Sequence, residues 1–161
     1  MKKIPRVLLA VMLASAFIFA ATPVDDPYSS LSQSERELLK PQVERWIKDQ
    51  IKRNWSDLWE IQDQTAELKN QLLLGDRDHP DLTRDAFVET MRASSGLGFP
   101  QIKAFNLIEI KGGNGRFQVT GCARLQRENW KQTRVTTVEA RIANSKVLFG
   151  LPHATAEACK L

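Results

Sequence analysis

The spacing of apolar residues changes near the middle of the chain, from the period of a helix to the period of a strand. Between residues 34 and 54, one helical stripe recurs at steps of four and consists of Leu39, Val43, Ile47 and Ile51, with Trp46 beside it. Ser34 and Glu37 have the spacing of a capping box. A proline sits badly inside a helix, so the regular helix is expected to start at Lys40–Pro41, after a loose turn.

Two further helical segments follow this first one. After a break at Asn54, "WSDLWEIQD" predicts a short second helix. "LTRDAFVETM" predicts a third, with Thr83 as its N-cap and with Phe87 and Met91 four positions apart. The first part of the domain is therefore predicted to be helical.

From Gln101 onward the period is two. "QIKAFNLIEI" predicts a strand whose alternation slips near Phe105, as at a bulge, and "KGGNG" predicts a hairpin turn. The remaining strands are predicted in "RFQVTGCARLQREN", "WKQTRVTTVEARIA" and "KVLFGL". Helices followed by an antiparallel meander indicate an α+β fold. We expect the helices within 34–95 to pack in the concave face of a curved four-strand antiparallel sheet within 101–151.

The N-terminus has the pattern of a secretory signal peptide. A basic start precedes an uncharged apolar run from Val7 to Ala21, which is shorter than the roughly 20 residues that span a bilayer. We expect cleavage after Ala20 or Ala21; an uncleaved anchor is the alternative. The predicted parts are a signal peptide (1–21), a flexible tether (22–33) and a single domain (34–161), in a periplasmic or secreted protein with no stable membrane span in the mature chain.

Removal of the signal peptide changes the charge of the chain. The sequence has 23 basic and 19 acidic residues, and loss of Lys2, Lys3 and Arg6 leaves a net charge of +1. A balance so close to zero does not favour nucleic acid or an anionic membrane as the partner.

The chain has two cysteines, Cys122 and Cys159. In an oxidising compartment they are expected to pair, and the loop so closed is worth roughly 3.5–4 kcal/mol. Cys122 lies on the strand face opposite Phe117, Val119 and Leu125, so the bond would fix the C-terminal tail to that opposite surface. We expect a short helical turn to carry Cys159 there; two buried free thiols are the alternative.

The residues do not predict a metal or a cofactor. The cysteines and histidines are too few and too scattered for structural zinc. "GDRDHPD" places three aspartates close together but lacks the glycine and the final glutamate of a calcium loop. We read it as a polar turn.

The order of elements resembles the NTF2-like superfamily, which includes ketosteroid isomerases and SnoaL-type cyclases. The resemblance covers residues 36–151 and rests on "VERWIKDQIKRNWSDLWEIQD", on "LTRDAFVETM" and on the four strands, without a diagnostic motif. It implies a cone-shaped fold with a pocket and leaves a homodimer through the sheet as an option. It implies no particular activity, because the superfamily contains enzymes and non-enzymes.

The residues of that family's catalytic sites are not matched here. Tyr28 falls in the predicted tether, and His79 and His153 fall in a turn and after the last strand. The acids that could point into the cone are Asp63, Glu109 and Glu139; a solvated surface position is the alternative for each. The candidates for the pocket lining are Trp55, Trp59, Phe87 and Phe117, with core packing as the alternative.

Two functions remain open on this basis. The first is an exported, non-catalytic module that binds a small apolar ligand or a protein partner. The second is an enzyme of the isomerase or hydrolase type that uses an interior carboxylate. The lack of a placed tyrosine or histidine favours the first.

Overall fold

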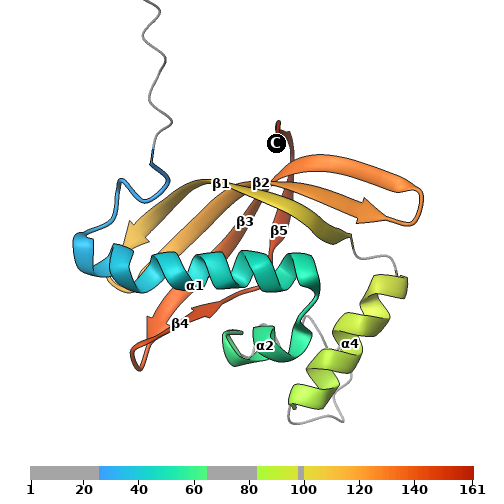
Figure 1. Cartoon of the computed structure of the whole chain (residues 1–161), viewed down its shortest axis with the longest axis horizontal. Coiled ribbons are helices and arrows are strands. Elements are labelled where there is room, and N and C mark those ends of the chain that lie inside the picture. The colour runs from blue at the N-terminus through green and yellow to red at the C-terminus, as the bar shows by residue number, and fades with distance from the viewer. Residues whose placement is uncertain (1–25, 65–82, 98–99) are drawn as a thin grey trace, which may run out of the picture.

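The elements follow the order that the periodicity predicts, with helices first and strands after them (Figure 1). The computed structural model describes residues 26–64, 83–97 and 100–161. Its helices are α1 (Gln33–Lys52), α2 (Trp55–Glu60) and α4 (Arg84–Leu97). Its strands are β1 (Gln101–Gly113), β2 (Arg116–Arg127), β3 (Trp130–Ala143), β4 (Lys146–Phe149) and β5 (His153–Ala158). The fold is α+β, as expected.

Helix α1 begins with a capping box two residues before the predicted one. The Glu35 amide donates to Ser32 Oγ (3.3 Å), and the Ser32 amide donates to Glu35 Oε2 (3.0 Å). These bonds from Ser32 lower the pKa of the Glu35 carboxyl. The predicted pair of Ser34 and Glu37 is therefore wrong. The same serine–glutamate spacing occurs twice in "SQSERE", and the helix uses the first.

The loose turn that we predicted before Pro41 is also wrong, because α1 runs through this proline. Pro41 and Glu37 are both exposed, so water can bond the Glu37 carbonyl that loses its helical donor. The buried face is rotated from the predicted stripe. Ile47 and Ile51 are only half-buried, and the buried residues are Leu39, Val43, Trp46, Asp49 and Gln50. Steps of four, three and four follow the 3.6-residue turn, whereas steps of four alone drift around the helix.

The four predicted strands form an antiparallel meander in the order β1-β2-β3-β4. The register of β1 against β2 shifts between Ile102 and Ala104 and again between Leu107 and Glu109, so bulges lie on either side of Phe105. Tight turns with positive φ join the strands, at Asn114–Gly115 and at Asn144–Ser145. These features match the predicted slip and turns.

A fifth strand, β5, replaces the helical turn predicted in the tail, so that prediction is wrong. β5 pairs antiparallel with β3 through Arg134, Thr136 and Thr137. β4 is only four residues long and covers one end of the β3 edge, whereas β3 has 14 residues. The remaining backbone groups of β3 need partners, and this need outweighs the helix propensity of the alanines in the tail.

The inward face of the sheet packs against the helices. On β2 the buried residues alternate: Phe117, Val119, Gly121, Ala123 and Leu125. At the centre, the Trp46 ring of α1 stacks on Phe149 of β4 (5.7 Å) and meets Phe105 of β1 edge to face (5.6 Å). The Phe105 ring in turn covers Gly121, where a Cβ would lie 2.2 Å from it. These three aromatic rings therefore join α1 to β1 and to β4, the first and last strands of the meander.

The outward face is mostly solvent-exposed. Arg116, Gln118 and Arg124 alternate with the buried residues of β2 and are exposed, whereas Cys122 on the same face is only 1% exposed. Cys122 is bonded to Cys159, with 5.8 Å between the two Cα atoms. The predicted disulfide is thus present in the structure, on the predicted face of β2.

Residues 26–31, which we assigned to the tether, lie against the edge of β1. The Ile110 amide donates to the Pro27 carbonyl (2.9 Å), and Ser30 Oγ donates to the Ile110 carbonyl (2.5 Å). Tyr28 is 7% exposed and belongs to the core. Its burial, and secondarily the negative charge of Glu44, raises the Tyr28 pKa to about 12. This part of the predicted tether is therefore bound to the domain.

Within the described ranges, no helix is long and apolar enough to cross a membrane. The predicted signal peptide lies outside the described residues.

Candidate functional site

The acid Asp63 lies where the chain leaves α2 and runs beside β4. The Phe149 amide donates to the Ile61 carbonyl (2.7 Å), and the Asp63 amide donates to the Phe149 carbonyl (2.7 Å). From there the Asp63 carboxylate forms a two-point ion pair with Arg141 of β3, at 2.5 and 2.7 Å. This hydrogen bonding raises the pKa of Arg141. Asp63 thus ties the helical segment to the sheet.

The other two candidate acids lie on the surface of the sheet. Glu109 has a side chain 41% exposed and pairs with Lys111 Nζ at 2.8 Å. Glu139 is exposed on β3. The three acids therefore do not form one common site. Asp63 joins two elements, and Glu109 and Glu139 face water.

The four aromatic candidates are parts of the core. Phe87 and Phe117 are 0% and 4% exposed, and Trp55 and Trp59 pack against the core cluster. The Trp59 and Phe87 rings lie 5.3 Å apart and join α2 to α4. The core-packing alternative describes their positions.

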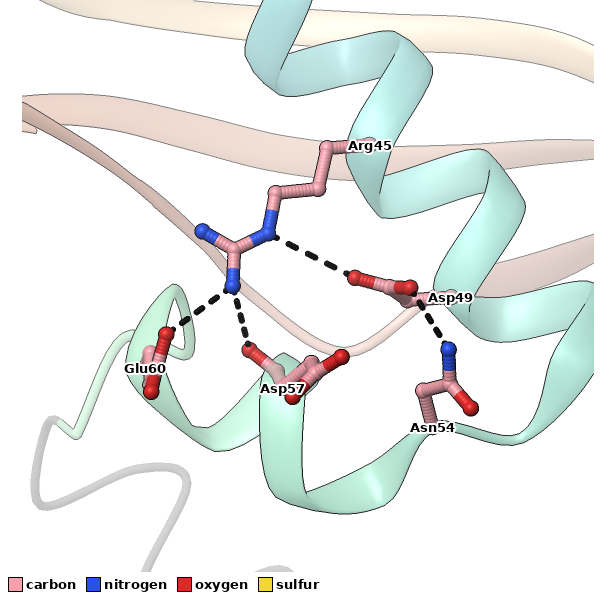
Figure 2. Close-up of polar contacts among 5 residues, drawn as sticks. All are labelled: Arg45, Asp49, Asn54, Asp57 and Glu60. Atoms are coloured by element: carbon pink, nitrogen blue, oxygen red, sulfur yellow. Dashed lines mark hydrogen bonds and ion pairs between the residues drawn. The ribbon is translucent and has the colours of Figure 1, made fainter.

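A buried carboxylate that the sequence analysis did not single out lies at the junction of α1 and α2. Asp49 is 4% exposed. Its Oδ1 accepts from Asn54 Nδ2 (3.0 Å), and its Oδ2 lies 3.5 Å from Arg45 Nε (Figure 2). The Asp49 carbonyl also accepts from the Asn54 amide (2.9 Å). The side chain and backbone of one residue therefore fix the end of α1 to the start of α2.

Arg45 extends this group to the far end of α2. Its Nη2 donates to Glu60 Oε2 (2.9 Å) and to the Asp57 carbonyl (3.4 Å) (Figure 2). The hydrogen bond to Glu60 is the main cause that raises the pKa of Arg45, and Asp49 adds to it. We call Arg45, Asp49, Asn54 and Glu60 the elbow cluster. It fixes the angle between two helices and leaves one carboxylate inside the protein.

A second buried polar group lies one turn from Asp49 on the same helix. Trp46 is 0% exposed, and its Nε1 has no hydrogen-bond partner among the described residues. The sequence did carry a signal for Asp49, because it lies three positions after Trp46 and hence on the same face of a helix. The predicted apolar stripe included Ile47 and Ile51, and a helix with that stripe buried would have Asp49 on its solvent side.

Two hollows in the described surface are open to solvent and are lined by residues outside the elbow cluster. One is lined by Pro100 and by the turn residues from Arg127 to Trp130. Another lies along α4, between Asp85 and Ala93. Neither is lined by the candidate acids or by the four aromatic candidates.

The described residues contain no group of three or more metal-ligating side chains. The predicted polar turn "GDRDHPD", with His79, lies outside the described residues. His153 is exposed at the start of β5.

Comparison with known proteins does not place the chain in a family. No protein-family model matches it. No curated protein matches it. Among solved structures, the chain is similar to a SEC-C motif containing protein from Rhodopseudomonas palustris, with 14% identity and a TM-score of 0.43, over 67% of this chain and 71% of that one.

These findings overturn the resemblance to the NTF2-like superfamily. No family model matches the chain, and no comparison returns that superfamily, so the predicted family is wrong. Helices followed by a meander are common to many α+β domains, so the order of elements was too general a pattern to identify one family.

Proposed function

We propose that this protein is an exported, non-catalytic binding domain that recognises a protein partner on the outward face of its sheet. The observation that carries the proposal is the contrast between the two faces of β2. Its inward residues are buried beneath the helices, whereas Arg116, Gln118 and Arg124 are exposed on a broad polar surface. Such a face offers many hydrogen-bonding groups at fixed spacing, which suits a polar protein interface.

Three observations support a role without catalysis. Asp63 is neutralised by Arg141, and Glu109 is paired with Lys111. Glu139 faces water. The two hollows named above are open to solvent, whereas small-molecule sites are usually enclosed and apolar. The proposal takes the helices to fill the concave side of a curved sheet, so that the convex side is left for the partner.

Export is part of this proposal. The apolar run from Val7 to Ala21 has the pattern of a cleaved signal peptide, and the disulfide between Cys122 and Cys159 suits an oxidising compartment. N-terminal sequencing of the exported protein should find a chain that starts at Ala21 or Thr22. A chain that still starts at Met1 contradicts this part of the proposal.

The binding face is tested by photo-crosslinking in the periplasm of the native host, followed by mass spectrometry. A photoreactive residue at Gln118 should capture a discrete partner. The control position is Lys48, which is exposed on α1. Equal capture from Gln118 and Lys48, or capture from Lys48 alone, contradicts the proposed face.

The buried Asp49 favours a second candidate, an isomerase or hydrolase that uses an interior carboxylate. It is buried beside a second polar donor, Asn54 Nδ2. A screen of ester and carbonyl substrates with wild type and Asp49→Asn separates the two functions. Turnover that the substitution abolishes, in a variant with an unchanged melting temperature, would favour the enzyme.

A further inference from the structure

The turn between β2 and β3 carries a charge that the balance of the whole chain conceals. Residues 124–134, which we call the β2–β3 tip, hold one acid, Glu128, and four bases: Arg124, Arg127, Lys131 and Arg134. The net charge of these residues is +3, against +1 for the chain without its predicted signal peptide. The cations are therefore concentrated at one place on the fold.

These cations are available to a partner. Arg124, Arg127 and Lys131 are exposed, and Arg134 is half-buried. Among the residues that the structure describes, the ion pairs involve other side chains, and none includes these four. An anionic surface would meet them without first having to break a salt bridge.

An exposed tryptophan lies among the cations. Trp130 is 38% exposed and pairs across the hairpin with Arg127. Together with Pro100 and the turn residues it lines the shallow hollow at this end of the sheet. An indole ring combines a large apolar surface with one polar N–H, and tryptophans accordingly concentrate at the boundary between water and lipid.

The register of the hairpin presents cations on both of its faces. Lys131 and Arg124 share the outward face with Cys122, whereas Arg127 and Arg134 lie on the inward face with Ala123. The turn lies at the end of the sheet, past the end of α1 in the view of Figure 1. A surface that approaches this end would therefore meet positive charge on both faces, with Trp130 on the inward face opposite Arg127.

We propose that the β2–β3 tip binds the surface of an anionic phospholipid bilayer. The cations lie over the lipid phosphates, and Trp130 enters the headgroup layer. A single exposed indole at a turn suits this partner better than single-stranded nucleic acid, which needs a basic groove with several stacking rings. The inference does not depend on the proposed protein partner, because Arg127, Trp130 and Lys131 lie outside the positions of β2 that carry that proposal, and only Arg124 is shared.

Co-sedimentation of the mature protein with lipid vesicles tests the proposal. The protein should bind vesicles that contain phosphatidylglycerol, should not bind pure phosphatidylcholine, and should be released by high salt. Each unit of charge near such a surface changes binding about fivefold, so Lys131→Glu should weaken it about 25-fold. Glu128→Gln should strengthen it about fivefold. Trp130→Ala should weaken binding and leave its salt dependence in place.

The matched control is Lys146→Glu. Lys146 is exposed at the turn between β3 and β4, so the same charge change is made at another hairpin of the same sheet. It should bind within about twofold of wild type, because Lys146 lies near the opposite end of β3 from the tip and salt screens charges over such a separation. Circular dichroism and melting temperature confirm the fold of every variant.

Several results would overturn the proposal. They are equal binding to both kinds of vesicle, binding to neither, or equal losses in Lys131→Glu and Lys146→Glu. Preferential binding of single-stranded DNA that the tip variants weaken would also overturn it and would assign the tip to nucleic acid.

Discussion

The two faces of the sheet are stabilised in different ways. The inward face is held by packing, and it centres on Trp46, whose ring meets both Phe105 and Phe149. The outward face of β2 has one buried residue, Cys122, which is held by a covalent bond to Cys159. Burial of apolar surface stabilises the first face, and a covalent constraint on the unfolded chain stabilises the second.

This difference means that substitutions on the two faces should have different effects. The inward residues depend on shape, because cores are packed as densely as organic crystals. The outward residues should tolerate substitution unless the disulfide is involved, because the core does not depend on their shape. Their side chains can therefore serve in binding. Of the following four predictions, the first three test this contrast and the fourth gives a reference outside the sheet.

The largest effect is expected from Trp46→Ala. Removal of this ring leaves a cavity between α1 and the sheet and should lower the free energy of unfolding by about 3–5 kcal/mol. Urea denaturation measures the change. Gln118→Ala on the outward face is the control and should stay within about 0.5 kcal/mol of wild type. Similar losses in both variants would remove the proposed difference between the faces.

The disulfide should account for the next largest effect. Cys122→Ser and Cys159→Ser should each lower the free energy of unfolding by about 2–4 kcal/mol while the fold is retained. Thermal unfolding with and without a reducing agent checks the prediction. The reducing agent should lower the melting temperature of the wild type and leave that of both variants unchanged. Two free thiols per chain in the unfolded, non-reduced wild type would show that the bond does not form in solution.

The third prediction concerns Tyr28, which lies at the edge of the inward core. Its pKa is raised from 10.0 to about 12 in the folded protein, so the folded state binds its proton more tightly than the unfolded state does. The resulting stabilisation is complete below pH 10 and should be lost as the pH rises toward 12, by about 1–3 kcal/mol. Tyr28→Phe should show a smaller decline over this range.

Near-ultraviolet absorbance of tyrosinate measures the Tyr28 pKa directly, because the chain contains a single tyrosine. A folded-state pKa close to 10 would contradict the docking of residues 26–31 against β1.

The smallest effect is expected at the start of α1, which belongs to neither face. Ser32→Ala removes the N-cap and should lower the free energy of unfolding by about 1 kcal/mol. Ser34→Ala is the matched variant two residues away and should change it by less than half of that. Chemical denaturation distinguishes the two registers of the capping box, and a larger loss at Ser34 would reverse the assignment.

The sequence predicted the order of elements because periodicity reports which face of a helix or strand is buried. The helix starts at Asn54 and Thr83, the slip near Phe105 and the two glycine or asparagine turns were all readable in this way. The disulfide was predictable from the count of cysteines.

Other features depended on contacts that one segment cannot report. β5 forms because β4 leaves part of the β3 edge open, whereas its alanines favour a helix when considered alone. The elbow cluster joins Arg45 to Glu60 across a bend whose angle the sequence does not state. Asp49 was missed because a one-position error in the apolar stripe changes which side chains face inward.

The backbone contact between residues 61–63, after α2, and Phe149 of β4 is a parallel bridge, and it has a consequence for how the chain folds. Phe149 meets Trp46 through its ring and residues 61–63 through its backbone, so the N-terminal half cannot complete its packing until this late residue is present. A chain that is synthesised, or threaded through a translocation channel, from its N-terminus passes most of its length before those contacts can form. Because long-range contacts close slowly, we expect the emerging polypeptide to stay open to chaperones until nearly all of it has arrived.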